Sequence, residues 1–458
     1  MRLVTRISRL AFAAIMMMLM LSTTHVVAQT LTAPNARATV AATADASSST
    51  SQIAIDALKT ANAARTSANT AWVLIATVLV LMMGFPGLAL FYAGLTREKN
   101  AVNTFLQVVV AIMLATLAFM LVGFGLAFGP GDQWIGSLMP PSSWFFLDKP
   151  MDSLYPGVNA PLFFIFQLAF AAVTVGIVLG ASMERISFPF VILFVPLWVI
   201  FVYCPVARWV WSEHGWLHSI GAIDFAGGLV VHVCSGCSAL ALAIMLGKRR
   251  GFGSESFEPN SPALAALGAA ILIVGWYGFN AGSALAADAN ATRALVSTHI
   301  AAAAGAVTWL VIELMSRRYT TLIGVLTGVI GGLVAITPAS GYVAPETAVL
   351  IGAIGSAAAY LGAVIMRGLA LFDDALDVFG VHATAGIVGS LLTGALASSA
   401  LVRTASVKAQ LIATAAVVGY AFVATLLLVA VLRLILKLRV SPQDEDAGLD
   451  LKYHGEPG

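Results

Sequence analysis

The sequence predicts an all-α polytopic membrane protein with about eleven transmembrane helices, arranged as an inverted repeat of five plus five helices and one final helix. Three observations support this prediction. Hydrophobic residues make up 59% of the 458 residues and charged residues only 10%, whereas soluble domains are about half apolar and about a quarter charged. The apolar residues gather in runs of about 20, the length that crosses a bilayer. One histidine-containing segment occurs twice, five spans apart.

The first residues are typical of a secretory signal peptide. Three arginines lie within the first nine residues, before an apolar run at 10–21 and a small-residue sequence at 26–28. Because the run is too short to span a bilayer comfortably, we expect residues 1–28 to be a signal peptide, with an uncleaved anchor helix as the alternative. Residues 29–70 contain few large apolar side chains and predict a flexible or weakly helical extracytoplasmic segment.

Eleven apolar runs follow and define a membrane domain at residues 71–436. A short tail at 437–458 comes after this domain. Most of the runs have about 20 residues or more, as spanning helices require. The expected spans are 71–93, 102–128, 161–182, 188–207, 223–246, 262–282, 295–315, 321–337, 348–365, 378–397 and 409–436.

Basic residues are distributed unevenly among the loops that join these spans. One alternating set of loops holds Arg97, Lys99, Arg185, Lys248, Arg249, Arg250, Arg317, Arg318 and Arg367. The other loops hold only Lys149, Arg208, Arg293, Arg403 and Lys408. The positive-inside rule makes the first set cytoplasmic. With an odd number of spans, we therefore expect an outer N-terminus and a cytoplasmic tail in the cell (inner) membrane. Nothing in the composition indicates a nucleic acid partner.

The most informative feature is the repeated histidine segment, on the fifth and the tenth spans. His232 and His382 each follow a valine and precede a glycine by four positions, and each has an aspartate eight positions upstream, Asp224 and Asp374. A unit of five spans duplicated in tandem must cross the membrane in opposite directions, which is the plan of many transporters. We therefore expect the two histidines to meet near the midplane.

A polar side chain inside the bilayer costs about 2 to 4 kcal/mol on insertion scales, so a matched pair indicates one shared site. Two touching imidazoles would share one hydrogen bond and remain neutral. Such a pair can bond a small neutral solute or relay a proton, but it cannot replace the hydration shell of sodium or potassium. Two alternatives stay open: each histidine bonds only to a backbone carbonyl or serine, or the pair clamps a haem iron.

Cys234 and Cys237 form a C-x-x-C motif beside His232. Redox or metal chemistry needs thiolates, which burial in hydrocarbon disfavours, so we interpret these cysteines as small packing residues. The sequence also has no cluster of carboxylates with metal-ligand spacing. We therefore expect no enzyme, no metal and no cofactor.

Aromatic side chains on the third, fourth and sixth spans form a second group of candidate residues. Tryptophan at a helix end is usually an interfacial belt residue, and phenylalanine deep in a span usually packs. Aromatic faces beside a hydroxyl can also hold a small cation, an attraction worth about 2 kcal/mol or more when desolvated. The aromatic residues are Phe166, Phe170, Trp209, Trp211, Trp276 and Phe279, with Ser283 as the hydroxyl.

Six stretches resemble signatures of the ammonium transporter (Amt/MEP/Rh) family, and the resemblance covers residues 71 to about 456. They are FPG…FYAGL at 85–95, AIDFAGG at 222–228, GWYGFNAGS at 275–283, TPA at 337–339, DVFGVH at 377–382 and GLDL at 448–451. The resemblance implies a role for each matching position. His232 and His382 would line the pore, Trp211, Phe170, Ser283 and Asp224 would recruit ammonium, Phe170 and Phe279 would form a gate, and Trp276 and Phe166 would line the vestibule.

The resemblance also implies nitrogen uptake, a homotrimer with one pore per subunit, and a PII-type nitrogen regulatory protein at the cytoplasmic exit. We expect ammonium to lose its proton and ammonia to pass through the pore while the proton is relayed separately. An ammonium sensor that signals through the tail is the alternative, and a haem or redox membrane enzyme is a third hypothesis. Arg208 occupies a place where many relatives have histidine, so we expect it to pair with Glu213 or to point away from the outer mouth.

Overall fold

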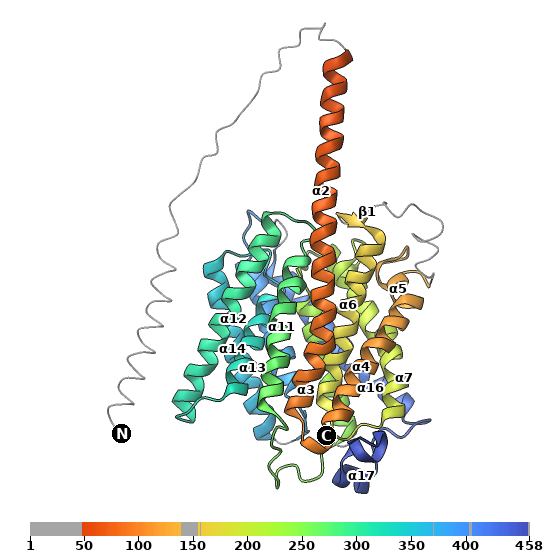
Figure 1. Ribbon diagram of the computed structural model, residues 1–458, viewed down its shortest axis with the longest axis vertical. Helices are drawn as coiled ribbons and strands as arrows, with labels where there is room; N and C mark the ends of the chain where they lie inside the picture. The colour runs from red at the N-terminus through yellow and green to blue at the C-terminus, as the bar shows by residue number, and fades with distance from the viewer. Residues whose placement is uncertain (1–47, 139–153, 156, 370, 403–404, 457–458) are drawn as a thin grey trace, which may run out of the picture.

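The computed structural model describes residues 48–138, 154–155, 157–369, 371–402 and 405–456. The expected signal peptide at 1–28 lies outside these residues. The described part is a helical bundle whose long helices run roughly along one common axis (Figure 1).

The first half of the chain supplies the helices up to α10. They are α2 (Ser48–Met82), η1 (Met83–Leu88), α3 (Ala89–Leu95), η2 (Glu98–Asn100), α4 (Ala101–Ala118), η3 (Phe119–Gly123), α5 (Phe124–Phe128), α6 (Ala160–Leu179), η5 (Gly180–Ser182), α7 (Phe188–Trp198), η6 (Val199–Tyr203), α8 (Cys204–Trp211), α9 (Trp216–Ser219), η7 (Gly228–Val233) and α10 (Cys234–Leu246). Two short strands, β1 (Leu154–Tyr155) and β2 (Val158–Asn159), pair antiparallel before α6.

The second half supplies the remaining helices. They are α11 (Pro262–Gly282), α12 (Ala289–Ser316), α13 (Leu322–Ile336), α14 (Pro345–Leu369), η8 (Phe379–Ala383), α15 (Thr384–Leu396), α16 (Val407–Leu432), α17 (Pro442–Ala447) and η9 (Asp450–His454).

Within the described residues, ten helical segments are long and apolar enough to cross a membrane. Helix α13 is a shorter apolar helix of 15 residues, which is about 22 Å of helix against a hydrocarbon core of about 30 Å. With α13, the apolar helices match the eleven predicted spans one for one. The all-α membrane fold is therefore confirmed.

Helix α2 differs from the prediction at its beginning. It starts at Ser48 and continues without a break into the first span, and in Figure 1 its first part projects beyond the bundle. Of the two expected forms, flexible or weakly helical, residues 48–70 adopt the helical one, because alanine, which is abundant here, is the strongest helix former. We call this end of the bundle the α2 end, and the opposite end, where α17 lies (Figure 1), the tail end.

Helix α6 lies at the centre of the bundle. In the span Ala160–Ser182, 94% of the most apolar 18-residue stretch is buried. A helix that is apolar on all sides and buried on all sides has neighbours all around it. Any group that α6 directs inward is therefore shielded from both water and lipid.

The two histidine-bearing spans pack against each other in a symmetric manner. The π-helical turn η7 contacts α15, and the matching turn η8 contacts α10. The crossing is so close that a Cβ atom added to Gly236 would lie 2.5 Å from the backbone nitrogen of Ala383. Glycine at this position therefore permits the approach that brings the two histidines together.

The tail folds back over the tail end of the bundle. The carboxylate of Asp450 accepts hydrogen bonds from the backbone nitrogens of Val102 and Asn103, at 3.0 and 2.8 Å. It thereby caps the first turn of α4, whose N–H groups have no partner within the helix. Glu445 bonds the backbone nitrogen of Arg250 at 2.7 Å, which ties α17 to the loop after α10.

Candidate functional site

The two histidines meet in the interior of the bundle. Nδ1 of His232 lies 3.2 Å from Nδ1 of His382, and the ring centroids are 5.3 Å apart with planes inclined by 20°. His232 is fully buried and His382 is 9% exposed. A hydrogen bond between these nitrogens requires one of them to donate and the other to accept. The facing nitrogens therefore share a single proton, and the site can hold or pass one.

Each histidine sits in a π-helical turn at the beginning of its span, His232 in η7 and His382 in η8. The backbone nitrogen of Val231 bonds the carbonyl of Gly227 at 2.9 Å, and Val381 bonds Asp377 in the same manner at 2.8 Å. π-Helical turns are rare and frequently mark functional sites. The duplicated sequence thus produces a duplicated local structure.

Asp224 fixes the first turn before His232. Its Oδ1 accepts the backbone N–H groups of Gly227 and Gly228, at 2.9 and 2.6 Å, and its Oδ2 accepts those of Leu229 and Val230, at 2.8 and 3.1 Å. The side chain is 6% exposed. All four donors at a helix start are otherwise without partners. Asp224 therefore holds the backbone and has both oxygens occupied.

Asp374 occupies the equivalent position before His382, but its bonding differs. Its Oδ2 accepts the backbone N–H of Phe379 at 2.7 Å. Its Oδ1 is shielded from solvent and has no hydrogen-bond partner among the described residues. The cap is therefore repeated in the second half with one oxygen left open.

Aromatic rings are stacked on the α2 side of His232. Phe170 and Phe279 have centroids 4.3 Å apart at an interplanar angle of 35°. Trp276 stacks on the His232 ring at 5.2 Å and 18°, and its indole nitrogen donates to the Thr337 hydroxyl at 2.9 Å. The rings leave a dry, apolar layer directly over the histidine pair.

The sequence-predicted recruitment residues lie farther toward the α2 end. Trp211 meets Phe170 edge to face at 5.6 Å, and its indole nitrogen donates to the backbone carbonyl of Asp224 at 2.9 Å. Phe166 meets Phe170 at 5.0 Å. The Ser283 hydroxyl donates to the carbonyl of Phe279 at 2.8 Å, one helical turn away. The structure thus brings Trp211, Phe166 and Phe170 into one aromatic cluster and places Ser283 directly after it.

Arg208 is buried at the end of α8, and its guanidinium donates to backbone carbonyls. Nη1 bonds Gly129 at 2.7 Å, while Nε and Nη2 bond Asp132 at 3.0 and 2.8 Å. These bonds hold the side chain against the loop after α5. The two expectations were a pair with Glu213 and a side chain that points away from the outer mouth. The bonds that the structure shows go to Gly129 and Asp132 rather than to Glu213.

Two other polar residues of the spans are satisfied locally. His299 Nδ1 lies 2.7 Å from the Tyr277 hydroxyl. Glu313 accepts the backbone nitrogen and the hydroxyl of Thr321, at 2.9 and 3.0 Å. The three cysteines, at 204, 234 and 237, are free and buried. Among the described residues, no three His, Cys, Asp or Glu side chains are grouped so as to hold a metal ion.

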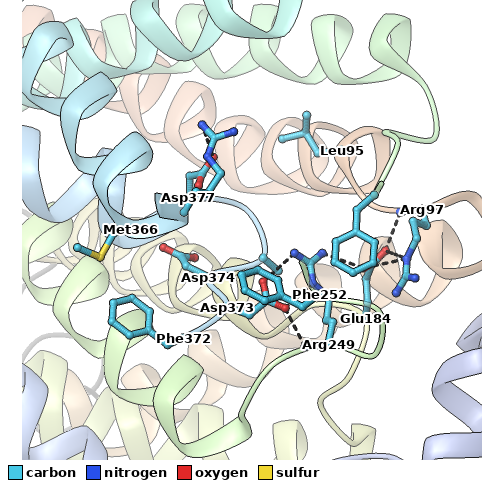
Figure 2. Close-up of a pocket in the computed structure, with 13 residues that line it drawn as sticks. Leu95, Arg97, Glu184, Arg249, Phe252, Met366, Phe372, Asp373, Asp374 and Asp377 are labelled. Atoms are coloured by element: carbon cyan, nitrogen blue, oxygen red, sulfur yellow. Dashed lines mark hydrogen bonds and ion pairs between the residues drawn. The ribbon is translucent and has the colours of Figure 1, made fainter. Parts of the chain in front are cut away.

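A cavity of about 220 Å³ lies at the tail end, on the far side of the histidine pair. Figure 2 shows it between the end of α3, the loop after α10 and the loop before η8. Its charged lining consists of Arg97, Glu184, Arg249, Arg367, Asp373, Asp374 and Asp377. Phe372 and Met366 contribute apolar surface beside Asp374.

Most of these charges are paired with one another. Arg249 lies between two carboxylates, 2.7 Å from Asp373 and 2.9 Å from Glu184. Arg97 contacts Glu184 at 3.1 Å, and Arg367 contacts Asp377 at 3.5 Å. Such a network offsets the cost of burying its charges. In the sequence these arginines indicate only the orientation of the chain. The carboxylates in neighbouring loops are the signal that could have indicated the network.

The electrostatics of the cavity separate its carboxyls into two kinds. Burial opposes ionisation of Glu184, but Arg249 and Arg97 outweigh it and lower the pKa of Glu184 to about 2. Burial and the neighbouring Asp377 raise the pKa of Asp374 to about 7, although the bond from Phe379 opposes that rise. Glu184 is therefore a permanent anion, whereas Asp374 can take up and release a proton near neutral pH.

The arrangement as a whole has three chemically distinct parts along the bundle. An aromatic cluster lies at the α2 end, a neutral imidazole pair lies in the apolar interior, and a charged cavity lies at the tail end. Hydrated ions cannot cross the interior without losing their shell, and two neutral imidazoles cannot replace it. A small neutral molecule does not carry this cost, and the imidazole pair can hold a proton.

Known proteins similar to this chain provide a comparison for these three parts. A family model described as the Ammonium Transporter Family matches residues 71–458. The chain is 40% identical over 399 residues to "Ammonium transporter Amt1" of Archaeoglobus fulgidus, with 85% of this chain and 98% of that protein covered.

Two solved structures are similar as well. Mep2 of Saccharomyces cerevisiae aligns with a TM-score of 0.75 and 34% identity, covering 82% of this chain and 90% of that chain. A structure described as "Sensor Amt Protein" aligns with a TM-score of 0.78 and 32% identity, covering 85% of this chain and 99% of that chain.

Proposed function

Because the chain belongs to the ammonium transporter family, we propose that it recruits ammonium at the α2 end, removes one proton and conducts ammonia past the histidine pair. The proton travels separately along the imidazoles. The observation that supports this proposal most directly is the 3.2 Å contact between His232 and His382 beneath the aromatic layer. The relatives are transporters rather than enzymes, and so is this chain.

Recruitment is assigned to the aromatic cluster and the hydroxyl beside it. Ammonium carries four N–H donors and one charge, so it is attracted to the faces of Trp211 and Phe170. The Ser283 hydroxyl gives its hydrogen to Phe279, which leaves its oxygen lone pairs to accept an N–H from the substrate. Asp224 acts indirectly, because its oxygens are occupied by four backbone donors. Its negative charge favours a cation at this end.

The gate is assigned to Phe170 and Phe279, whose rings close the path above His232. Ammonium and potassium have similar sizes, so a pore of fixed radius cannot distinguish them. Ammonium, however, can lose a proton, and ammonia needs no hydration shell. The rings therefore exclude potassium and water, while Trp276, Phe166 and the gate residues line the approach that ammonia takes.

Substitution of the pore histidines tests this function. We expect His232→Ala and His382→Ala proteins in liposomes either to lose ammonium transport or to admit potassium, because the proton path and the dry lining are both interrupted. Ammonium-evoked and potassium-evoked currents on supported membranes measure this. His218→Ala, on the exposed surface of the short helix α9, is the matched control. Selective ammonium currents of parental size in both pore variants would refute the proposal.

The proposal extends to assembly and orientation. We assign the chain to a homotrimer in the cell (inner) membrane, with the α2 end outside and the tail end in the cytoplasm. Supporting this assembly, His299 is exposed on the surface of the apolar span α12, where contact with lipid is costly and a second copy would remove it. Supporting the orientation, Arg97, Arg249 and Arg367 all lie at the tail end. A cleaved signal peptide at 1–28 agrees with an outer N-terminus.

A regulatory partner is assigned to the cytoplasmic face. The PII-type nitrogen regulator that the family resemblance implies would meet the cavity and the docked tail there. The second candidate function, an ammonium sensor, is favoured by the similarity to a structure described as a sensor. Uptake of ammonium by the reconstituted chain alone distinguishes the two, since a sensor needs to bind ammonium but need not move it.

A further inference from the structure

Four carboxylates line the tail-end cavity, and three of them have arginine partners. Glu184 and Asp373 share Arg249, and Asp377 faces Arg367. Asp374 differs, because no arginine within the part of the chain described here forms an ion pair with it, and its Oδ1 is shielded and without a hydrogen-bond partner. In Figure 2 it lies on the side of the cavity that holds Met366, Phe372 and Asp377, away from Arg97 and Glu184.

Asp374 is also close to the histidine pair along the chain. It bonds the backbone nitrogen of Phe379 at 2.7 Å, and His382 follows three residues later, about 4.5 Å along the helix axis. Helical side chains tilt toward the helix N-terminus, so the His382 side chain leans toward Asp374. Asp374 therefore lies at the tail-end start of the helix that carries His382, with one carboxylate oxygen open.

We propose that Asp374 is the inner proton acceptor of the transport cycle, an inference that rests on the proposed function. Ammonium at the outer site gives ammonia and a proton. The proton crosses the imidazole pair and converts the Asp374 carboxylate to the carboxylic acid, while ammonia reaches the cavity. Ammonia then takes the proton from Asp374, which restores the carboxylate and releases ammonium. One positive charge crosses per cycle, and each group returns to its starting form.

The surroundings suit this role. The cavity of about 220 Å³ has room for ammonium and a few waters, at about 30 Å³ for each water. Arg367 is half exposed, so the cavity reaches the surface and the product can leave. The titratable groups near Asp374 are Asp377, Asp373 and the Tyr92 hydroxyl, and the nearby cations are Arg249 and Arg367. Their combined effect keeps Asp374 able to bind a proton at neutral pH, as its pKa of about 7 indicates.

Asp374→Asn tests this role, because asparagine keeps the shape and the acceptor for Phe379 but cannot bind the proton. In liposomes we expect the ammonium-evoked current to fall about tenfold or more, while entry of neutral ammonia, followed as internal alkalinisation with a pH-sensitive dye, persists. Glu255→Gln removes an exposed carboxylate from the loop after α10, at the same end of the bundle but outside the cavity lining. It is the matched control and should keep the parental current.

The outcomes separate this inference from the proposed function. A parental chain with neither current nor ammonia entry would refute the function. If the parental chain transports, two results for Asp374→Asn would overturn only the role of Asp374. The variant could keep its current, or it could lose both its current and ammonia entry. If Asp374→Asn fails to fold, Asp374→Glu tests the role of Asp374 instead. Its current should persist with a shifted pH of half-maximal current, and an unshifted pH profile would overturn the inference.

Discussion

Asp224 and Asp374 hold the same position in the two halves of the repeat, but they have different surroundings. Asp224 accepts four backbone N–H groups with its two oxygens. Asp374 bonds Phe379 and leaves its Oδ1 open beside a charged cavity. In both halves the aspartate caps the start of the histidine-bearing helix, but the two carboxylates accept different numbers of backbone N–H groups.

The two halves also differ at the residue three positions later. Gly227 and Asp377 both have left-handed backbone conformations, with φ of 113° and 53°. Glycine adopts this conformation without steric cost, and aspartate is among the few residues that tolerate it. Glycine adds no side chain near Asp224. Burial raises the pKa of the Asp374 carboxyl, and Asp377 adds a second negative charge that raises it further. The same fold thus yields a structural cap at one end and a titratable group at the other.

The largest effect expected from this comparison is on stability. Asp224→Ala leaves four backbone donors without their acceptor, and each unsatisfied buried donor costs about 1–3 kcal/mol. Asp374→Ala removes the bond to Phe379 and should cost far less. Thermal unfolding of both variants in detergent, followed by loss of the folded peak in size-exclusion chromatography, measures the difference. Equal unfolding temperatures would mean that the two caps are equivalent.

A smaller effect concerns the pH dependence of stability. The pKa of Asp374 is about 7, against an ordinary value of 3.8, so the folded chain binds an extra proton between these values. Its contribution to stability therefore falls as pH rises from about 4 to about 7. Relative to the parent, Asp374→Asn should unfold at increasingly higher temperature across that window and level off above it.

Glu184→Gln provides the control of opposite sign. Its pKa is lowered to about 2 from an ordinary value of 4.5, so the ionised form stabilises the fold above pH 4.5 and this gain is lost as pH falls toward 2. At about pH 5–8, the variant should be less stable than the parent. Raising the pH within this range should not change the difference in stability between them. Parallel profiles for both variants would contradict the division of the cavity carboxyls into two kinds.

The smallest effect is expected at the edge of the cavity. Arg367 lies 3.5 Å from Asp377 and both side chains are partly exposed, and pairs of this kind contribute about 0–1 kcal/mol. Arg367→Gln should therefore change the free energy of unfolding by less than about 1 kcal/mol, measured by denaturation in detergent. A larger loss would show that Arg367 supports the loop before η8 in another manner.

The sequence predicted the parts of the molecule that depend on local pattern. Apolar runs of spanning length identified the eleven helices, and the repeated spacing of aspartate and histidine identified both the inverted plan and the residues that meet at 3.2 Å. The aromatic residues of the third, fourth and sixth spans were found as well, although their contacts depend on how those helices pack.

Other features could not be predicted because they depend on distant segments. Whether a carboxylate such as Asp374 is paired or open depends on which loops meet at the tail end, and five separate segments line that cavity. Composition alone left residues 48–70 either flexible or weakly helical, and the abundant alanine favours the helix that the structure has there. The bonds of Arg208 to Gly129 and Asp132 likewise required the folded loop.

The cap that Asp450 places on α4 joins nearly the last part of the chain to the second span. Ribosomes make proteins from the N-terminus onward, so α4 is synthesised long before its capping carboxylate exists. Until then, the N–H groups of Val102 and Asn103 must be hydrated. A nascent chain that terminates early never acquires the Asp450 cap. Completed molecules should therefore resist unfolding better than truncated ones.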